Sequence, residues 1–179
     1  MNGSSEYREL LLGCGNRRDK RITLEGLPDE WKNLVTLDID KACVPDVVYN
    51  LERLPWPFQD NVFDEVHAYE VLEHIGQQGD FKAFFDHFHE IWRMLKPNGY
   101  LMATCPAMNS PWLWGDPGHK RVIAPESLIY LSSEEYENQV GKTAMTDYRW
   151  YWKGNFKIVS ILNDPVHALF GFALQAMKG

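Results

Sequence analysis

The stretch LLLGCGNRRDKRITLEGLPDEWKNLVTLDID, residues 10–40, decides the fold of this chain. Its first apolar run ends in Gly13 and Gly15, and a second apolar run, about twenty residues later, ends in Asp38. Glycine tolerates positive φ and lets a ligand lie against the backbone. A carboxylate at that distance can accept hydrogen bonds from both ribose hydroxyls. The pattern therefore predicts a nucleoside site at the C-terminal edge of a parallel sheet.

The glycine pattern alone does not identify the nucleoside. In a dinucleotide fingerprint, G-x-G-x-x-G, the third glycine would stand where this chain has Arg18. That glycine lets the following helix pack closely on the strand, so its absence argues against a nicotinamide dehydrogenase. A tight strand-to-loop turn that holds no ligand remains an alternative interpretation of these glycines.

Outside this stretch, the sequence alternates between strand and helix patterns. Residues 80–95 have apolar side chains at three- and four-residue steps, which predicts an amphipathic helix. Asp80 is its expected N-cap, and Pro97 is expected to end it. The link from Asn163 to Pro165 is too short for a parallel crossover, so it predicts an antiparallel hairpin. Strands are expected at residues 9–12, 35–39, 46–49, 63–68, 100–105, 156–162 and 168–177.

Composition indicates one globular domain, residues 1–179. Apolar residues make up 45% and charged residues 24% of the chain, which is typical of a folded protein. A net charge of -7 argues against a general nucleic-acid or membrane binder. The three cysteines have no C-x-x-C spacing, so neither a disulfide framework nor a zinc site is expected. The first residues, 1–5, are polar and lack the apolar core of a signal peptide, which predicts a cytoplasmic protein.

Several segments, in order, resemble the class I S-adenosylmethionine-dependent methyltransferases, in particular the small variety whose first motif reads L-x-L-G-C-G-N. The resemblance implies a single Rossmann-like α/β domain. Its sheet would be mostly parallel and seven-stranded, with a C-terminal antiparallel hairpin and helices on both faces. The matching segments are LLLGCGN (10–16), VTLDID (35–40), DVVYNLERLPWPFQDNVFDEVHAYEVLEHI (46–75), IWRMLKPNGYLMATCP (91–106) and DPGHKR (116–121).

The same resemblance implies a site for the cofactor S-adenosylmethionine. The two glycines would pass beneath its methionine and ribose, and Asp38 would accept hydrogen bonds from the ribose. Asn50 would contact the adenine amino group through its carbonyl oxygen, and Leu51 would pack on the adenine face. The full set of expected cofactor-binding residues is Gly13, Cys14, Gly15, Asp38, Ile39, Asn50, Leu51 and Glu70.

One position departs from the family pattern. Many relatives have an acid two residues before the first glycine, where it holds the amino group of the cofactor, and this chain has Leu11 there. We expect Glu70, or backbone carbonyls near Gly13, to make that contact. The alternative for Glu70 is an ordinary acid at a helix entry. His74 is expected to line the pocket or to serve structure rather than to act as a base.

The acceptor side of the site is expected between residues 106 and 121. His119 is the candidate catalytic base, because a histidine of ordinary pKa is largely neutral at pH 7. Trp112 and Trp114 could cover a substrate, or they could simply pack this loop onto the core. The aromatic residues between 148 and 152 could wall the same cleft or belong to the core and surface. No metal ion is expected, since His67, Glu70 and His74 have no recognised ligand spacing.

Two classes of function follow from these observations. The favoured one is an enzyme that transfers a methyl group from S-adenosylmethionine to a small-molecule acceptor by in-line displacement. The alternative is a non-catalytic methyltransferase-like binding or regulatory subunit. We expect no nucleic-acid or membrane partner. We also expect an acceptor cleft that is either open or completed by the second subunit of a homodimer.

Overall fold

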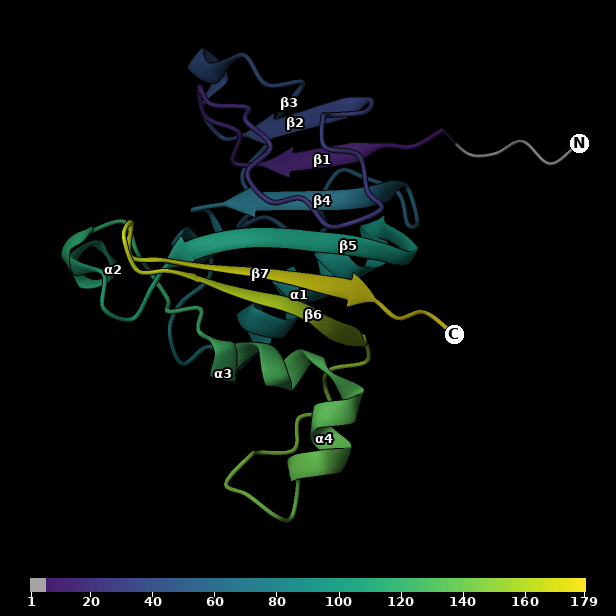
Figure 1. Ribbon diagram of the computed structural model, residues 1–179, viewed down its shortest axis with the longest axis vertical. Coiled ribbons are helices and arrows are strands. Elements are labelled where there is room, and N and C mark those ends of the chain that lie inside the picture. The colour runs from purple at the N-terminus through teal and green to yellow at the C-terminus, as the bar shows by residue number, and fades with distance from the viewer. Residues whose placement is uncertain (1–5) are drawn as a thin grey trace, which may run out of the picture.

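A computed structural model describes residues 6–179, and the polar residues 1–5, on which the signal-peptide argument rests, lie outside it. The core of the molecule is one seven-stranded sheet with the order β3-β2-β1-β4-β5-β7-β6 (Figure 1). Strands β1 to β5 run parallel, and β7 is antiparallel to both β5 and β6. The strands are β1 (Glu9–Leu12), β2 (Leu34–Asp38), β3 (Val47–Val48), β4 (Phe63–Tyr69), β5 (Leu95–Pro106), β6 (Phe156–Asp164) and β7 (Leu169–Ala176).

The predicted sheet and its C-terminal hairpin are confirmed, and the largest difference lies at the start of β5. That strand begins at Leu95, five residues before the predicted Tyr100, because Leu95 pairs with Phe63 before the register shifts. Residues 96–99 form the irregularity, and Asn98 adopts a positive φ of 65° there. The Pro-Asn-Gly turn signal therefore marks a bulge within the strand.

Helix α1 (Phe81–Met94) forms where the apolar periodicity predicts it. Asp80 caps its N-terminus by accepting a hydrogen bond from Ala83 N at 3.0 Å, as expected. Its apolar stripe, which includes Phe85, Phe88 and Ile91, is buried against the sheet. The remaining helical segments are short: η1 (Lys41–Cys43), η2 (Leu72–His74), α2 (Pro111–Gly115), α3 (Pro125–Leu128), η3 (Ile129–Leu131) and α4 (Ser133–Gln139).

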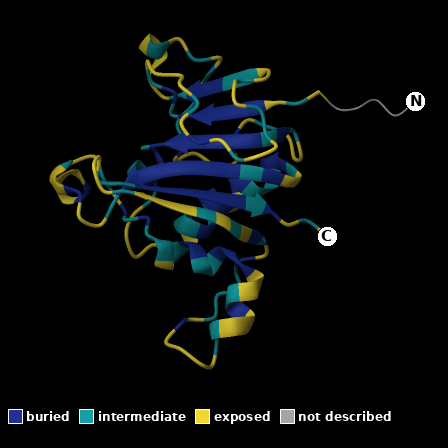
Figure 2. Cartoon of the chain, viewed as in Figure 1, coloured by how far each residue is buried: buried dark blue, intermediate teal, exposed yellow. Residues whose placement is uncertain are grey.

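The two faces of the sheet are covered differently. Helix α1 packs on the face that carries the larger part of the core, and the strands are mostly buried in Figure 2. Helices α3 and α4 add Leu128 and Tyr136 to that core, and α4 extends beyond the β6 edge of the sheet (Figure 1). On the other face, Leu11 and Met102 meet Ile22 and Trp31 of the irregular segment 16–33. Within residues 6–179, this irregular segment stands where the sequence analysis expected helices on the second face. Gly26, at a φ of 85°, and Pro28 interrupt a helical backbone in the middle of this segment.

A group of buried charges lies beneath this irregular segment. Lys20 Nζ lies 2.5 Å from Glu9 Oε1 and 2.9 Å from Glu65 Oε2, and all three side chains are at most 3% exposed. Glu65 Oε2 also accepts a hydrogen bond from His67 Nε2 at 2.8 Å. Burial lowers the pKa of His67, so its ring is neutral and Lys20 is the cation that faces both carboxylates. These contacts fasten the segment to strands β1 and β4.

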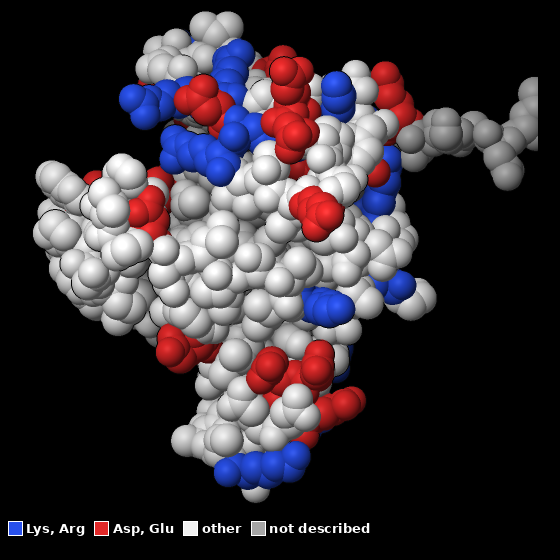
Figure 3. All heavy atoms as spheres, in the orientation of Figure 1, with Lys and Arg blue, Asp and Glu red and all other residues white. Residues whose placement is uncertain are grey.

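The charged surface is mixed in sign. On the face drawn in Figure 3, Lys and Arg lie among Asp and Glu at the upper end, acidic side chains lie above a basic group at the lower end, and the middle is mostly uncharged. Among the helices of residues 6–179, none has the length and apolar character needed to cross a membrane.

Replacing the buried lysine tests the role of this charge group. We expect Lys20→Met to lower the free energy of unfolding by about 3–5 kcal/mol, because two buried carboxylates would lose their cation. The exposed lysine of the same segment provides the control, and Lys32→Met is expected to change stability by less than about 0.5 kcal/mol. Urea denaturation of the three proteins measures both values. Equal stabilities would show that the group does not hold the segment in place.

Candidate functional site

A cavity of about 390 Å³ opens at the carboxyl ends of β1, β2 and β4. Ligands of open α/β sheets bind at this edge. Six of the eight expected cofactor residues line the cavity, and two, Cys14 and Gly15, do not. The lining consists of Gly13, Leu37, Asp38, Ile39, Tyr49, Asn50, Leu51, Glu52, Glu70, Val71, His74, Ile75 and Lys120.

The glycine turn after β1 forms one wall of this cavity. Gly13 and Gly15 have positive φ values of 57° and 49°, which favour glycine. A Cβ on Gly13 would also overlap Val71 Cγ2, whereas a Cβ on Gly15 would meet nothing within 4 Å. The side chain of Cys14 is buried in the core on the face of the sheet that segment 16–33 covers. Gly13 is therefore required for space as well as for conformation.

Asp38 connects the glycine turn to the end of β2. Its Oδ2 accepts a hydrogen bond from Gly15 N, and its Oδ1 accepts one from Asp40 N, both at 2.8 Å. A carboxylate has about four acceptor positions, so two of them remain for ligand hydroxyls. The side chain thus holds the turn in place and can still bind a ribose.

The opposite end of the cavity carries Asn50 and Leu51. Asn50 Oδ1 accepts a hydrogen bond from Glu52 N at 3.0 Å, which uses one of its two lone pairs. The other lone pair can still accept from an amino group such as that of adenine, and the amide NH₂ can donate to a ring nitrogen. Leu51 is held by the indole of Trp56, which donates to the Leu51 carbonyl oxygen at 2.9 Å. The arrangement offers a hydrogen-bond donor beside an apolar surface, as a planar base requires.

Glu70 follows β4 and has an unusual backbone conformation. Its φ is +58°, a region that costs a non-glycine residue about 1–2 kcal/mol, and its N–H donates to Thr104 O at 2.8 Å. Its Oε1 is buried and finds no hydrogen-bond partner within residues 6–179. Burial raises the pKa of Glu70 above its ordinary value. Such strain and a free buried oxygen are common where a side chain is held for a ligand.

A second cavity, of about 220 Å³, adjoins the first and shares Glu70 and His74 with it. His119, the candidate base, lines this second cavity, with its ring centroid 4.6 Å from that of His74. The sequence analysis missed His167, which reaches the cavity from the β6–β7 turn. The full lining is Glu70, Glu73, His74, Pro106, Ser110, Trp112, Asp116, His119, His167 and Leu169.

Glu73 stands out among these residues because it is completely buried. Neither of its carboxylate oxygens has a hydrogen-bond partner in the described part of the chain. Burial raises its pKa to about 8. Its backbone carbonyl accepts hydrogen bonds from Lys120 N and Arg121 N, at 2.8 and 3.2 Å, which ties η2 to the loop after β5.

The tryptophans of this loop are on the surface. Trp112 is 72% and Trp114 70% exposed, so the interpretation in which both pack the loop onto the core is wrong. Trp112 lines the second cavity, and Trp114 does not. Lys120 Nζ lies 2.5 Å from Glu52 Oε1 at the rim of the first cavity. Only part of the loop after β5 therefore faces the two adjoining cavities.

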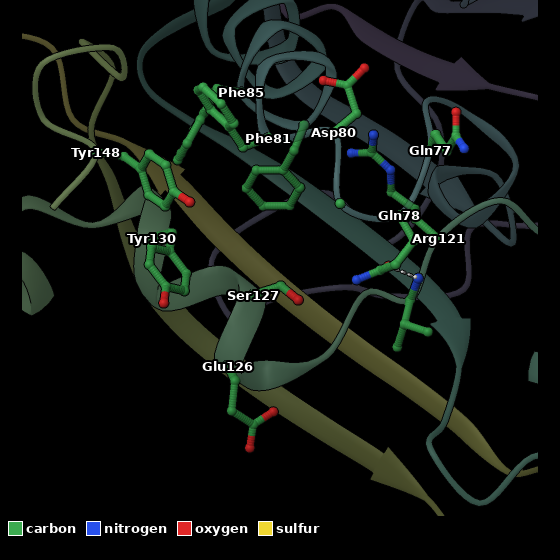
Figure 4. A pocket seen from close by; sticks show the side chains of 13 residues that line it. Gln77, Gln78, Asp80, Phe81, Phe85, Arg121, Glu126, Ser127, Tyr130 and Tyr148 are labelled. Carbon is green, nitrogen blue, oxygen red and sulfur yellow. Dashed lines mark hydrogen bonds between the residues drawn. The ribbon is translucent and has the colours of Figure 1, made fainter. Parts of the chain in front are cut away.

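Arg121 points away from both of them, into a separate cavity of about 390 Å³ beside the start of α1. Figure 4 shows Phe81, Tyr130 and Tyr148 across this space from the arginine. Trp152 belongs to the core, and Trp150 is 63% exposed. The aromatic cluster after residue 147 therefore contributes to this separate cavity and to the core.

The fold and the first cavity define a Rossmann-like domain with a site for a nucleoside. A model of a family described as a methyltransferase domain matches residues 10–103, and the chain belongs to this family. The chain is accordingly a class I methyltransferase domain, whose cofactor is S-adenosylmethionine. No curated protein sequence matches the chain.

Solved structures share the fold at low sequence identity. The N-methyltransferase NodS from Bradyrhizobium japonicum aligns with a TM-score of 0.57 at 12% identity, over 97% of this chain and 88% of that chain. A chain from the complex between the Haloferax volcanii Trm112 methyltransferase activator and a putative methyltransferase aligns with a TM-score of 0.59 at 14% identity, over 99% and 86%. A 16S rRNA adenine methyltransferase from Catenulisporales acidiphilia aligns with a TM-score of 0.57 at 14% identity, over 98% and 87%.

The contact between Gly13 and Val71 can be tested by a pair of substitutions. We expect Gly13→Ala to destabilise the fold by about 1–2 kcal/mol more than Gly15→Ala, because both strain φ but only the former clashes. Val71→Ala removes the clashing methyl groups, so it should recover part of the loss when combined with Gly13→Ala. Chemical denaturation of the single and double variants measures the coupling. Strictly additive losses would contradict this packing.

Proposed function

We propose that this chain transfers a methyl group from S-adenosylmethionine to a small-molecule acceptor by in-line displacement. The observation that carries the proposal is that the two cavities are adjacent, with Glu70 and His74 in the linings of both. One cavity has the features of a nucleoside site, and the other is small and lined by polar side chains. The methyl group would pass between them.

The residues of the first cavity fit the cofactor. Asp38 retains acceptor positions for ribose hydroxyls, and the Asn50 amide and Leu51 offer a donor and an apolar surface for adenine. The free Glu70 Oε1 can accept from an ammonium group and so compensates for Leu11. When bound, the sulfonium supplies an already activated methyl group.

The protein's contribution is mainly positioning. Holding an acceptor in line and about 3–3.5 Å from the methyl carbon, and excluding water, can lower the barrier by about 7–11 kcal/mol. The exposed Trp112 at the mouth of the second cavity is suited to cover a bound acceptor. No general base is required unless the acceptor must lose a proton.

His119 is the candidate for such a base. Its Nδ1 lies 3.3 Å from the Leu113 carbonyl oxygen, which can only accept, so Nδ1 carries the hydrogen. Nε2 then has the lone pair and can receive a proton from an acceptor in the cavity. Asp116 Oδ2, 3.8 Å from that nitrogen, would stabilise the resulting cation.

A small acceptor is favoured by the size of the second cavity and by the surface charge. A net charge of -7 argues against a nucleic-acid binder, and the face drawn in Figure 3 carries charges of both signs rather than a basic patch. One structural neighbour methylates 16S rRNA, and another neighbour comes from a complex with a methyltransferase activator. Screening turnover with small amines, hydroxy compounds and RNA separates these acceptors.

Cofactor binding can be tested at the ribose contact. We expect Asp38→Ala to weaken S-adenosylhomocysteine binding by about 10- to 100-fold, as the loss of hydrogen bonds to a charged group would. Asp40→Ala is the matched control, because it lies in the same loop and caps Ala42 N at 2.8 Å. It should change the affinity by less than about threefold. Isothermal titration of folded variants gives both values, and equal affinities of Asp38→Ala and the parent would contradict the site.

The ammonium contact gives a separate test. We expect Glu70→Gln to weaken S-adenosylhomocysteine binding by roughly tenfold while leaving binding of adenosine, which lacks the amino acid part, nearly unchanged. Competition titration with the two ligands provides the comparison. A loss for both ligands would indicate a general structural effect, and no loss for either would assign the ammonium to backbone carbonyls near Gly13.

A further inference from the structure

Three side chains of the second cavity come together as a potential ion-binding group. Glu73, His74 and His119 each place one ligand atom so that all three atoms lie within 4.8 Å of one another. Glu73 and His74 are adjacent in η2, and His119 comes from the loop after β5. No metal ion was expected from the sequence, because neither the cysteines nor the histidines and Glu70 have a recognised ligand spacing and His119 is far from Glu73 and His74 along the chain.

The hydrogen bonds of the two histidines leave Nε2 as the nitrogen that is free to bind an ion. His74 Nδ1 lies 3.1 Å from the Gly118 carbonyl oxygen, and His119 Nδ1 lies 3.3 Å from that of Leu113. A carbonyl oxygen only accepts, so each Nδ1 carries the hydrogen and each Nε2 keeps its lone pair. Metal-binding histidines typically have this arrangement, with the second nitrogen fixed by a backbone carbonyl or carboxylate.

Two acids of the second cavity, Glu73 and Asp116, support this interpretation. Both oxygens of the buried Glu73 are free of hydrogen bonds to residues 6–179, a costly state that a bound cation would relieve. Asp116 Oδ2 lies 3.8 Å from His119 Nε2, and Asp116 Oδ1 is held by Gly118 N at 2.7 Å. Gly118 therefore positions His74 and Asp116 together, and a Cβ there would lie 3.3 Å from His74 Nδ1.

A second group of potential metal ligands already has partners within the protein. Glu9, Glu65 and His67 also place ligand atoms within 4.8 Å of one another. There, however, the Lys20 ammonium already lies between the carboxylates, and Tyr69 OH occupies His67 Nδ1 at 2.6 Å. That group is satisfied without an ion, so it carries no inference.

We propose that Glu73, His74 and His119 bind a divalent transition-metal ion, with Asp116 beside His119 at the edge of the group. Two imidazoles and a carboxylate are a ligand set of catalytic zinc sites, so Zn²⁺ is the ion that fits best. With the ion bound, His119 Nε2 would be a ligand and no longer the proton acceptor considered above. The ion would border the second cavity, where an open coordination position could hold an oxygen or nitrogen of the acceptor and ease the loss of its proton. This role rests on the proposed methyl transfer, whereas binding of the ion does not.

Metal binding to the full chain, first stripped with a chelator, tests the proposal without cofactor or acceptor. We expect one Zn²⁺ per chain by competition with a chromophoric chelator, and a tetrahedral absorption spectrum when Co²⁺ is added. His119→Gln is expected to weaken Zn²⁺ binding at least tenfold and to abolish that spectrum. His74→Gln should do the same, and the exposed His89 provides the control, with His89→Gln leaving both unchanged.

The possible results separate this proposal from the cofactor site. Failure of the parent protein to bind Zn²⁺ would overturn it, as would undiminished binding in both folded histidine variants. Urea denaturation establishes that these variants fold. A titration with S-adenosylhomocysteine, run in parallel on metal-free protein, reports on the proposed cofactor site alone.

Discussion

The hydrogen bond from Gly15 N to Asp38 Oδ2 is the contact on which the carboxyl edge of the sheet depends. It joins the ends of β1 and β2 across 23 residues of sequence and does so at 2.8 Å. The turn that makes it possible needs positive φ at both glycines, and Val71 presses against Gly13 from the loop after β4. Three strand ends are thereby fixed relative to one another. The cavity between them is a consequence of that arrangement.

On the face of the sheet that helices do not cover, the irregular segment 16–33 must be held in place by specific contacts. An irregular segment has few internal hydrogen bonds, so it needs specific contacts to stay on a sheet. Segment 16–33 obtains them from Lys20, which reaches Glu9 and Glu65, and from Tyr69 OH, which accepts from Arg21 N and Ile22 N at 3.1 and 3.2 Å. Buried charges are costly, but here they give the segment a single position. The glycine turn directly precedes this segment, so the fixed position of the segment also restricts the conformation of the turn.

Sequence reasoning succeeded where local rules decide the structure. Helix α1 follows from apolar periodicity and the Asp80 cap. The mostly parallel sheet with its antiparallel hairpin follows from the methyltransferase motifs and the short link after residue 162. Gly13, Asp38, Asn50 and Glu70 do line one cavity. Sequence reasoning failed where contacts between residues far apart in the sequence decide the structure. The bulge at residues 96–99 depends on pairing with β4, and the cover of the second face depends on buried ion pairs.

The lining of the second cavity, which we propose as the acceptor side, could be predicted least from the sequence, because separate elements of the fold build it. Its lining comes from η2, from the loop after β5 and from the β6–β7 turn, which are far apart in sequence. His167 reaches it only because β7 runs antiparallel beside β5 and brings the turn to the carboxyl edge, with Pro106 opposite Leu169. No spacing rule connects such positions. The glycine turn and Asp38, by contrast, are joined directly by a hydrogen bond at the ends of neighbouring strands, so local motif rules could place them together.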